Sequence, residues 1–171
     1  MKKPSFLLLS LLSLWSFVFL NCESFVPWGV IEFDKERFDE EWAAWEAQGL
    51  VNYSVKQAYS SVYPRKIRTH IIVQENAIIH KEFVDSWSLE QLEKDPDYIR
   101  RIDSFVKTIS EIYDHINRVS ESKEWRGIII RITYNDEFHF PELIEISDLE
   151  GGGSSRCLSE FIPLAPAAEE E

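Results

Sequence analysis

The chain has few glycines and few cysteines for its length. It contains six glycines and two cysteines in 171 residues, and three of the glycines are consecutive at 151–153. The sequence has no glycine-rich phosphate loop, no Gly-x-Ser-x-Gly turn and no pair of cysteines with metal-ligand spacing. It therefore lacks the motifs by which nucleotide-binding proteins, serine hydrolases and zinc proteins are commonly identified.

Basic residues are also scarce. The chain has 18 Lys and Arg residues against 30 Asp and Glu residues, which gives a formal net charge of −12. A surface of this sign repels phosphate backbones and anionic lipid headgroups, so we expect no nucleic-acid partner and no polybasic contact with a membrane. Six Trp, six Tyr and eleven Phe residues supply ample apolar material, so the acidity does not indicate disorder.

Long apolar segments are missing apart from one at the N-terminus. Lys2 and Lys3 precede an apolar run from Phe6 to Leu20, which is shorter than the roughly 20 residues that a helix needs to cross a bilayer. A positive start, a short apolar segment and a polar end are typical of a secretory signal peptide. We expect residues 1–21 to be removed on export, which leaves about 150 residues, enough for one domain.

The apolar run ends at Phe19-Leu20-Asn21-Cys22. This sequence resembles the lipobox of bacterial lipoproteins, in the looser form found in spirochaetes, in which the cysteine becomes the first mature residue and carries lipid. The resemblance implies that Cys22 is the lipid-attachment residue and that acyl chains such as palmitate anchor the protein to a membrane of the cell envelope. The alternative is an ordinary cleaved signal peptide with an incidental cysteine nearby.

The state of Cys157 depends on which of these two interpretations holds. If Cys22 is acylated through its sulfur, Cys157 has no partner in its own chain and is a free thiol. If Cys22 is not acylated, a disulfide between the two cysteines could join the ends of the mature chain. A mass measurement distinguishes the two states.

Hydrophobic periodicity begins after a short N-terminal segment. Residues 22–33 have no clear period, and we expect them to form a tether. Asp34 is a good N-cap, and Phe38, Trp42 and Trp45 recur at the spacing that places side chains on one face of a helix. The sequence therefore predicts an amphipathic helix after Asp34 whose aromatic face packs into a core.

Alternating and β-branched residues then predict three strands. Residues 51–63 alternate aromatic or aliphatic side chains with small or polar ones, as in a strand with one buried face. Residues 67–74 and 77–84 are β-branched runs on either side of Glu75-Asn76, and Asn tolerates the positive φ of a tight turn. These two runs are predicted to form a hairpin.

The register of this hairpin bears on two of the four histidines. A two-residue turn at 75–76 would place His70 opposite Lys81 and His80 opposite Ile71. Because adjacent strand residues point to opposite faces, His70 and His80 would then lie on different sides of the sheet. We therefore expect no metal site built from both.

The second half of the domain begins with the strongest helical pattern in the sequence. Asp95 and Pro96 suit the N-cap and first helical position, and apolar residues continue at helical spacing from Ile99 to Val119. This pattern predicts one helix of more than five turns. Such a broad apolar stripe must pack on another element, and the sheet is the available partner.

Two more strands and a tail complete the predicted organisation. Residues 125–134 and 142–148 are predicted to be strands, and residues 150–171, with Gly, Ser, Pro and a final acidic run, a flexible acidic tail. Local hairpins favour antiparallel pairing, so we expect an α+β fold: an antiparallel β-sheet of about four to five strands with helices packed on one face. The single domain is predicted to span 34–149.

Two further histidines have acidic neighbours in the sequence. Asp114-His115 suggests a general base, but neighbours on a helix point about 100° apart, so we interpret both as polar residues of a helix surface. His139 follows Asp136 and Glu137 in a turn, and one histidine with two flexible acids is a weak metal site. We interpret His139 as a turn residue near positive φ. The sequence thus predicts no catalytic residue, no metal and no cofactor.

The order of elements is similar to that of a family of uncharacterised bacterial lipoproteins and secreted proteins, known only as a domain of unknown function. The resemblance covers about residues 40 to 148 and implies fold and location, because no catalytic residue belongs to the pattern. The matching stretches are Trp45 with Tyr53-Ser54-Val55, the turn at Glu75-Asn76, Ile102-Asp103-Ser104-Phe105, and Ile132-Thr133-Tyr134-Asn135 leading to Pro141 and Ile144.

Three functions remain open from the sequence. The first is a membrane-anchored envelope lipoprotein that acts as a non-catalytic binding or inhibitor-like module, with a protein partner at a sheet face or edge. The second is an envelope hydrolase or metal-dependent enzyme whose residues converge only in three dimensions. The third is a structural spacer. A concave site with convergent ionisable groups distinguishes the enzyme from the other two.

Overall fold

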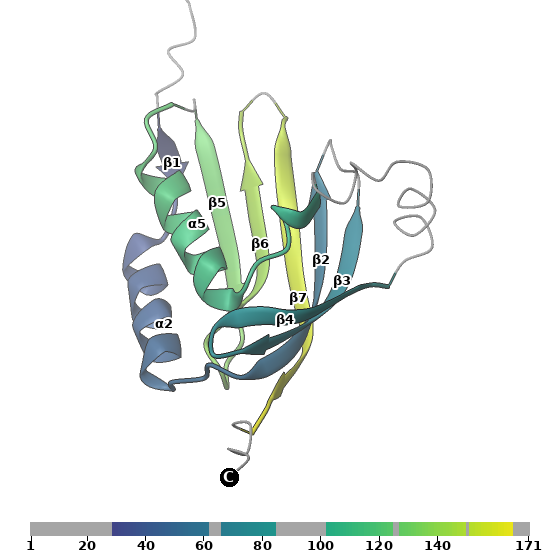
Figure 1. The fold of residues 1–171 in the computed structure, drawn as a ribbon. Coiled ribbons are helices and arrows are strands. Elements are labelled where there is room, and N and C mark those ends of the chain that lie inside the picture. Colours follow the sequence, from purple (N-terminus) through teal and green to yellow (C-terminus); the bar gives the residue numbers. More distant parts are fainter. Residues whose placement is uncertain (1–28, 62–65, 85–101, 125–126, 150, 166–171) are drawn as a thin grey trace, which may run out of the picture.

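One seven-stranded β-sheet organises the described part of the chain (Figure 1). The structure is a computed structural model that describes residues 29–61, 66–84, 102–124, 127–149 and 151–165. The strand order is β1-β5-β6-β7-β2-β3-β4. The elements are β1 (Val30–Glu32), α2 (Lys35–Ala47), β2 (Tyr53–Ser61), β3 (Ile67–Gln74), β4 (Ala77–Phe83), α5 (Ile109–Glu121), β5 (Ile128–Tyr134), β6 (Pro141–Ser147) and β7 (Gly153–Pro163).

The sheet corrects the predicted fold class. The expected α+β domain, with four to five antiparallel strands and helices packed on one face, is wrong. Within the described ranges the sheet has seven strands and is mixed, because β1 pairs in parallel with β5 while the other neighbours are antiparallel. The two helices of this part have only 13 residues each, so the domain is mostly β.

Two strands come from segments that the sequence analysis assigned to the tether and the tail. β1 lies inside 22–33, and β7 lies inside 150–171, where it pairs with β6 on one side and β2 on the other. The prediction of a flexible tail is therefore wrong for residues 153–163. Arg156 and Leu158 are buried on either side of the exposed Cys157, which is the period of a strand with one buried face.

Glycine at the start of β7 has a structural reason. A Cβ atom at Gly153 would lie 2.6 Å from the carbonyl oxygen of Ile146 and 3.1 Å from the Cα of Ser147. The absence of a side chain thus lets the backbones of β7 and β6 approach closely. What looked like a linker in the sequence is the point where the central strand enters the sheet.

The first helix confirms its prediction. Asp34 is the N-cap of α2, and its carboxylate accepts a hydrogen bond from the backbone N–H of Arg37 at 3.0 Å. Phe38 and Trp45 are buried, as the helical spacing of the aromatic residues predicted. Gly49 follows the helix with a φ of 62°, a conformation that glycine adopts without strain.

The second helix is shorter than predicted. Residues 95–101 lie outside the described residues, and the helix of more than five turns is interrupted before Ile109. Thr108 has an extended backbone and caps a new helix: its hydroxyl accepts from Glu111 N–H, while the Glu111 carboxylate accepts from Thr108 N–H at 2.7 Å. This reciprocal capping box satisfies two backbone donors, so the helix begins here although the apolar spacing continues upstream.

The hairpin of β3 and β4 turns where predicted but changes register beyond the turn. Glu75 and Asn76 have φ values of 51° and 62°, as a tight hairpin turn requires. A bulge follows at Ile72/Val73, and His70 pairs with Glu82, whereas Ile72 pairs with His80. This one-residue slip places His70 and His80 on the same face of the sheet, so the predicted opposite placement is wrong.

Aromatic side chains fill the core where α2 and α5 lie side by side against the sheet (Figure 1). The rings of Trp42 and Tyr113 stack at 5.6 Å, and Phe38 contacts both. Trp45 packs edge-on against Tyr53 and against Phe140 and Phe161. This aromatic half of the domain is closely packed.

Several predictions lie outside the described residues. These are the signal peptide at 1–21, the lipid-attachment residue Cys22, most of the tether, Asp95 with Pro96, and the end of the tail at 166–171. Among the residues that the structure does describe, no helix has the length and apolar character needed to cross a membrane.

Candidate functional site

A cleft of about 510 Å³ opens beside α5, over the ends of four strands. We call it the α5 cleft. His115 and Val119 of α5 form one wall, and the floor is mostly apolar, with backbone from the β6–β7 turn at its outer end. The residues that define it are Tyr59, Ser61, His115, Val119, Ile128, Ile146, Asp148 and Ser154.

The strand register explains how the floor is built. Ser154 of β7 pairs with Ile146 of β6 and with Ser61 of β2, so these three side chains form one row on the helix side of the sheet. The next row on the same side is centred on Arg156, which pairs with Tyr59. Arg156 therefore lies directly beyond the inner end of the cleft floor.

Arg156 is the most unusual charged residue of this region. Its side chain is only 6% exposed, and Nη1 donates a hydrogen bond to Gln57 Oε1 at 3.1 Å. The guanidinium carbon lies 5.2 Å from the ring centre of Tyr59, which is cation–π range. No carboxylate pairs with Arg156 in the described chain, and burial lowers its pKa to about 10, so it stays charged at neutral pH.

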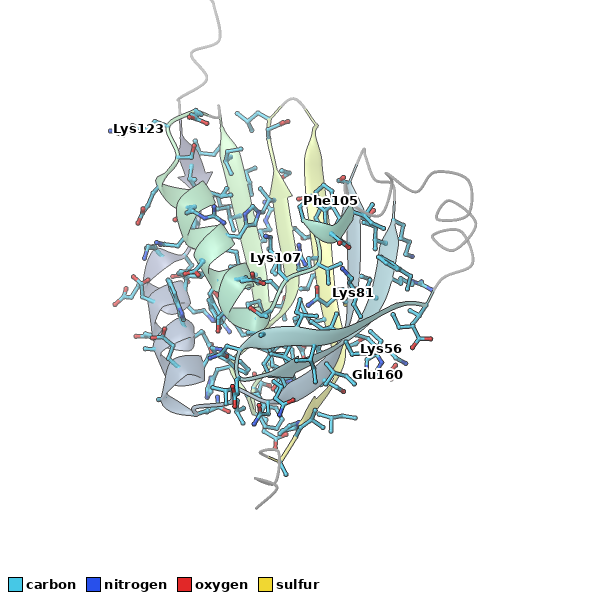
Figure 2. The ribbon with its side chains drawn as sticks, in the orientation of Figure 1. Lys56, Lys81, Phe105, Lys107, Lys123 and Glu160 are labelled. Carbon is cyan, nitrogen blue, oxygen red and sulfur yellow. The ribbon has the colours of Figure 1, made fainter. Side chains whose placement is uncertain are left out.

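The segment that leads into α5 packs on Tyr59, which lines the cleft. Phe105 stacks on Tyr59 with ring centres 4.7 Å apart, and Gln57 donates a hydrogen bond from its side-chain amide to the Lys107 carbonyl. Figure 2 shows Phe105 and Lys107 on this segment, in front of the sheet. The pair of rings and the Gln57 contact fix the segment over β2. Lys107 does not line the cleft, but its ammonium group acts on His115 in the cleft wall.

His115 is neutral in the cleft wall. Burial, first, and then the nearby cations Lys107, Arg156 and Arg118 in that order lower its pKa from the ordinary value to about 4. Burial likewise lowers the pKa of the Lys107 ammonium group, with Glu111 acting in the opposite direction. The helix-surface interpretation holds for Asp114, which is exposed, whereas His115 is partly buried and faces the cleft.

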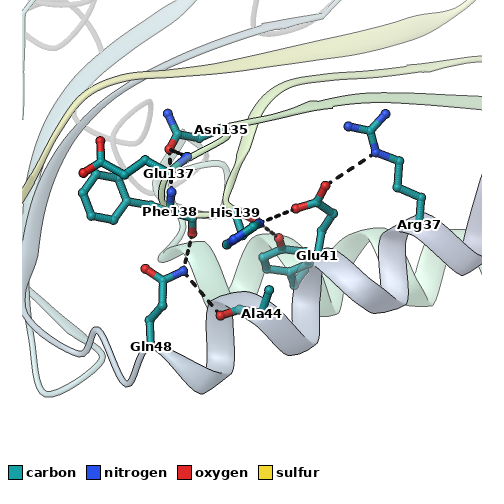
Figure 3. A network of polar contacts seen from close by, with 9 residues as sticks. Arg37, Glu41, Ala44, Gln48, Asn135, Glu137, Phe138 and His139 are labelled. Atoms are coloured by element: carbon teal, nitrogen blue, oxygen red, sulfur yellow. Dashed lines mark hydrogen bonds and ion pairs between the residues drawn. The ribbon is translucent and has the colours of Figure 1, made fainter.

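His139 is a turn residue, as the sequence analysis interpreted it, and its φ is 59°. Its ring does not meet Asp136 or Glu137: Nδ1 lies 2.8 Å from the carboxylate of Glu41 on α2 (Figure 3). The Tyr113 hydroxyl donates to the His139 carbonyl, which ties α5 to the same turn.

Gln48 completes this network from the end of α2. Its side-chain amide donates to the carbonyl of Phe138 at 2.9 Å, and Asn135 accepts from the backbone N–H of Phe138 at 2.7 Å inside the turn (Figure 3). These contacts hold the turn between β5 and β6 against both helices. We call this network the clamp between α2 and the β5–β6 turn, because it fixes the position of the turn.

The remaining sequence candidates do not form a metal site. His70 and His80 share a face, but no group of three or more His, Cys, Asp or Glu side chains in the described ranges is arranged to hold a metal ion. Cys157 is a free, exposed thiol on the side of β7 that faces away from the helices. Among the candidate residues that the structure describes, His115 is the one that lines the cleft.

The sequence analysis missed Tyr59 and Arg156 as site residues. Tyr59 belongs to the predicted strand, and its pairing with Arg156 was hidden because residues 150–171 were assigned to a tail. The available signal was the alternation Arg156-Cys157-Leu158 after three glycines, which suits a strand. His115 and Val119 were four residues apart on the predicted helix, the spacing that places both on one wall.

A family model matches residues 37–150 of this chain. The chain belongs to a family of unknown function, DUF6174. The match spans α2 to β6, including His115 and Tyr59, and ends before β7, so Arg156 and Ser154 lie beyond it. Comparison with curated proteins and with solved structures finds no match.

Proposed function

We propose that this protein is a lipid-anchored, non-catalytic binding module of the bacterial cell envelope, and that the α5 cleft takes a ligand with an apolar body. The observation that carries the proposal is the cleft of about 510 Å³, which is lined mainly by apolar side chains with a few polar groups at its ends. Small-molecule sites are typically concave and apolar, with few polar groups that fix orientation.

The cleft has one feature of an enzyme, because His115 lies in the same hollow as the hydroxyl of Ser154. A histidine base needs a nucleophile within hydrogen-bond reach, roughly 2.6–3.2 Å, and a third group that orients its ring. Within the described contacts His115 has no hydrogen-bonded partner of either kind. We therefore place binding ahead of the hydrolase alternative.

A protein partner at the sheet edge is the second candidate. β4 forms one edge of the sheet, and Ile79 on it is 59% exposed. An exposed edge strand can accept an added strand from a partner. Pull-down of envelope proteins with wild type and with Ile79→Lys tests this candidate: loss of a specific protein in the variant supports edge binding, and identical recovery removes it.

The cleft is tested by filling it. Ser154→Leu places a larger side chain on the cleft floor, whereas Ser155→Leu adds the same group on the opposite face of β7. We expect the neutral probe 4-phenylbutan-1-ol to bind wild type and Ser155→Leu alike and to bind Ser154→Leu at least about tenfold more weakly, measured by calorimetry on the full chain. Val119→Phe places a larger side chain in the cleft from the α5 wall. It replaces Ser154→Leu in this test if Ser154→Leu does not fold.

Absence of binding to wild type would contradict the proposal, and so would equal binding to all the variants. Thermal unfolding of each variant establishes that the comparison is made between folded proteins.

The membrane anchor is tested separately. A single acyl chain gives only marginal attachment, so stable anchoring requires the full lipid modification of the cysteine. We expect wild type and Cys157→Ala to sediment with membranes and Cys22→Ala to move to the soluble fraction. Recovery of Cys22→Ala in the membrane fraction would contradict lipid anchoring at this residue.

A further inference from the structure

We propose that the ligand of the α5 cleft is an amphipathic anion, whose carboxylate lies at the inner end near Arg156 and Lys107 and whose apolar body lies along Ile146 and Val119. This inference rests on the proposed function and specifies the ligand class. It begins from the placement of Arg156, which is buried in the row beside the cleft floor and has no carboxylate partner among the described residues.

An unpaired guanidinium is costly to bury, because it loses hydration that a single amide and one aromatic face replace only in part. Gln57 occupies Nη1 at 3.1 Å, and the Tyr59 ring covers the guanidinium at 5.2 Å. Carboxylates bind guanidinium groups well because two N–H donors can meet two oxygens. An anionic group at the inner end of the cleft would supply the missing counter-charge.

The charges that act on His115 in the cleft wall are of one sign. Lys107, Arg118 and Arg156 all act on His115, and each lowers its pKa as a nearby cation does. The Glu111 carboxylate raises the pKa of Lys107 and the pKa of Arg156. The same carboxylate also accepts the Thr108 N–H in the capping box of α5. The cleft wall at His115 thus lies in the field of three cations, although none of them lines the cleft itself, in a chain whose net charge is −12.

The outer end of the cleft is formed by the turn between β6 and β7. Asp148 lines it next to Gly152, where its carboxylate accepts the Gly152 N–H at 2.8 Å. Between the two ends lie the apolar side chains of Ile128, Ile146 and Val119. The cations that act on His115 therefore orient the anion inward, and the apolar body lies in the middle.

Three probes with the same phenylbutyl body separate this inference from the proposed function. They are 4-phenylbutyrate, 4-phenylbutan-1-ol and 4-phenylbutylamine, titrated into the full chain at pH 7 and low salt. We expect the carboxylate to bind at least about tenfold more tightly than the alcohol, because one charge-assisted hydrogen bond contributes about that much affinity. We expect the amine to bind most weakly.

Charge removal at Lys107 provides the matched variant test. Lys107→Met keeps the backbone that bonds Gln57 and removes the ammonium group, whereas Lys123→Met removes an exposed charge after the end of α5. We expect Lys107→Met to lower the preference for the carboxylate over the alcohol by roughly threefold or more, and Lys123→Met to leave it unchanged. Arg156→Gln should remove the preference, provided that thermal unfolding shows a folded protein.

The outcomes distinguish the two proposals. Equal affinity for carboxylate and alcohol, or tighter binding of the amine, would overturn the anion inference and leave cleft binding in place. A preference for the carboxylate that survives both Lys107→Met and a folded Arg156→Gln would also overturn it. If none of the three probes binds, the proposed function falls together with the inference.

Discussion

The two halves of the helix side of the sheet are built from different kinds of residue. The aromatic half, around α2 and the core-facing side of α5, packs Phe38 against the ring of Trp42 and packs Trp45 against the ring of Tyr53. The other half, beside the cleft, buries Gln57 and Arg156 next to an open hollow. One face of the sheet thus carries both a closely packed core and an open cleft.

The difference indicates where stability and function reside. Close ring packing buries large apolar areas and contributes most of the stabilisation of a domain. Buried polar groups and a hollow stabilise far less, because the polar groups lose hydration and the hollow lacks contacts. A region that keeps both is a candidate for ligand binding, since a ligand can supply the missing contacts.

The largest expected effect comes from the aromatic half. Trp45→Ala removes a side chain that is 3% exposed and in contact with the rings of Tyr53, Phe140 and Phe161, and we expect a loss of about 3–5 kcal/mol in the free energy of unfolding. Ile79→Ala, at an exposed position, should change it by less than about 0.5 kcal/mol. Denaturant unfolding measures both, and equal losses would break the comparison.

The second effect concerns the junction between the two halves. The Tyr53 hydroxyl accepts a hydrogen bond from the Ile109 N–H at 2.8 Å, at the first turn of α5. Tyr53→Phe leaves this buried donor without a partner, and we expect it to cost about 1–3 kcal/mol. Tyr134→Phe is the control, because the Tyr134 hydroxyl makes no hydrogen bond with another residue of the described ranges. A neutral Tyr53→Phe would mean that the start of α5 is held by other contacts.

The sequence predicted well where local rules decide the structure. The helix after Asp34 follows from an N-cap and an aromatic stripe, and the turn at Glu75-Asn76 follows from residues that adopt positive φ. These features depend on a few neighbouring residues, so pattern alone specifies them.

The sequence could not predict features that depend on distant partners. β7 is stabilised by β6 and β2, and its own Gly and Ser residues give little local preference for a strand. The β3–β4 bulge shifts His80 by one residue without any sequence signal that we recognised. The cleft and its surroundings need α5, β2, β5, β6 and β7 together, so Tyr59 and Arg156 became candidates only in the folded chain.

The half beside the cleft is expected to make the stability of the protein depend on pH. The pKa of His115 is about 4 in the folded protein, below the ordinary value near 6.5 of an unfolded chain. Between these values the unfolded chain binds a proton that the folded chain does not, so stability is full above pH 6.5 and falls as the pH approaches 4. We expect His115→Gln to reduce this loss by about 1 kcal/mol at pH 5, after discounting for the partial exposure of the ring.

Denaturant unfolding at pH 7, 6 and 5 makes this comparison, with His80→Gln, at an exposed position of β4, as the matched control. An identical pH dependence in wild type and His115→Gln would show that His115 is not desolvated in the cleft wall.

The smallest effect is expected at the clamp between α2 and the β5–β6 turn. Glu41→Gln removes the carboxylate that pairs with Arg37 at 3.5 Å and with His139 at 2.8 Å. Because these pairs are partly exposed, we expect a loss of about 0.5–1 kcal/mol, compared with no measurable loss for the exposed Glu40→Gln. A loss as large as that of Trp45→Ala would show that the aromatic half depends on this polar clamp.

The most direct test of the central claim is to locate a bound ligand on the full chain. A 4-phenylbutyrate that carries a photoreactive diazirine on its ring, followed by peptide mass mapping, identifies the residues it contacts. We predict labelling at Val119 on α5 and at Ile146 and Ser154 on the cleft floor, suppressed by excess unlabelled phenylbutyrate. Labelling concentrated at Leu143 and Cys157 on the opposite face of the sheet, or spread over the surface without competition, would contradict the account.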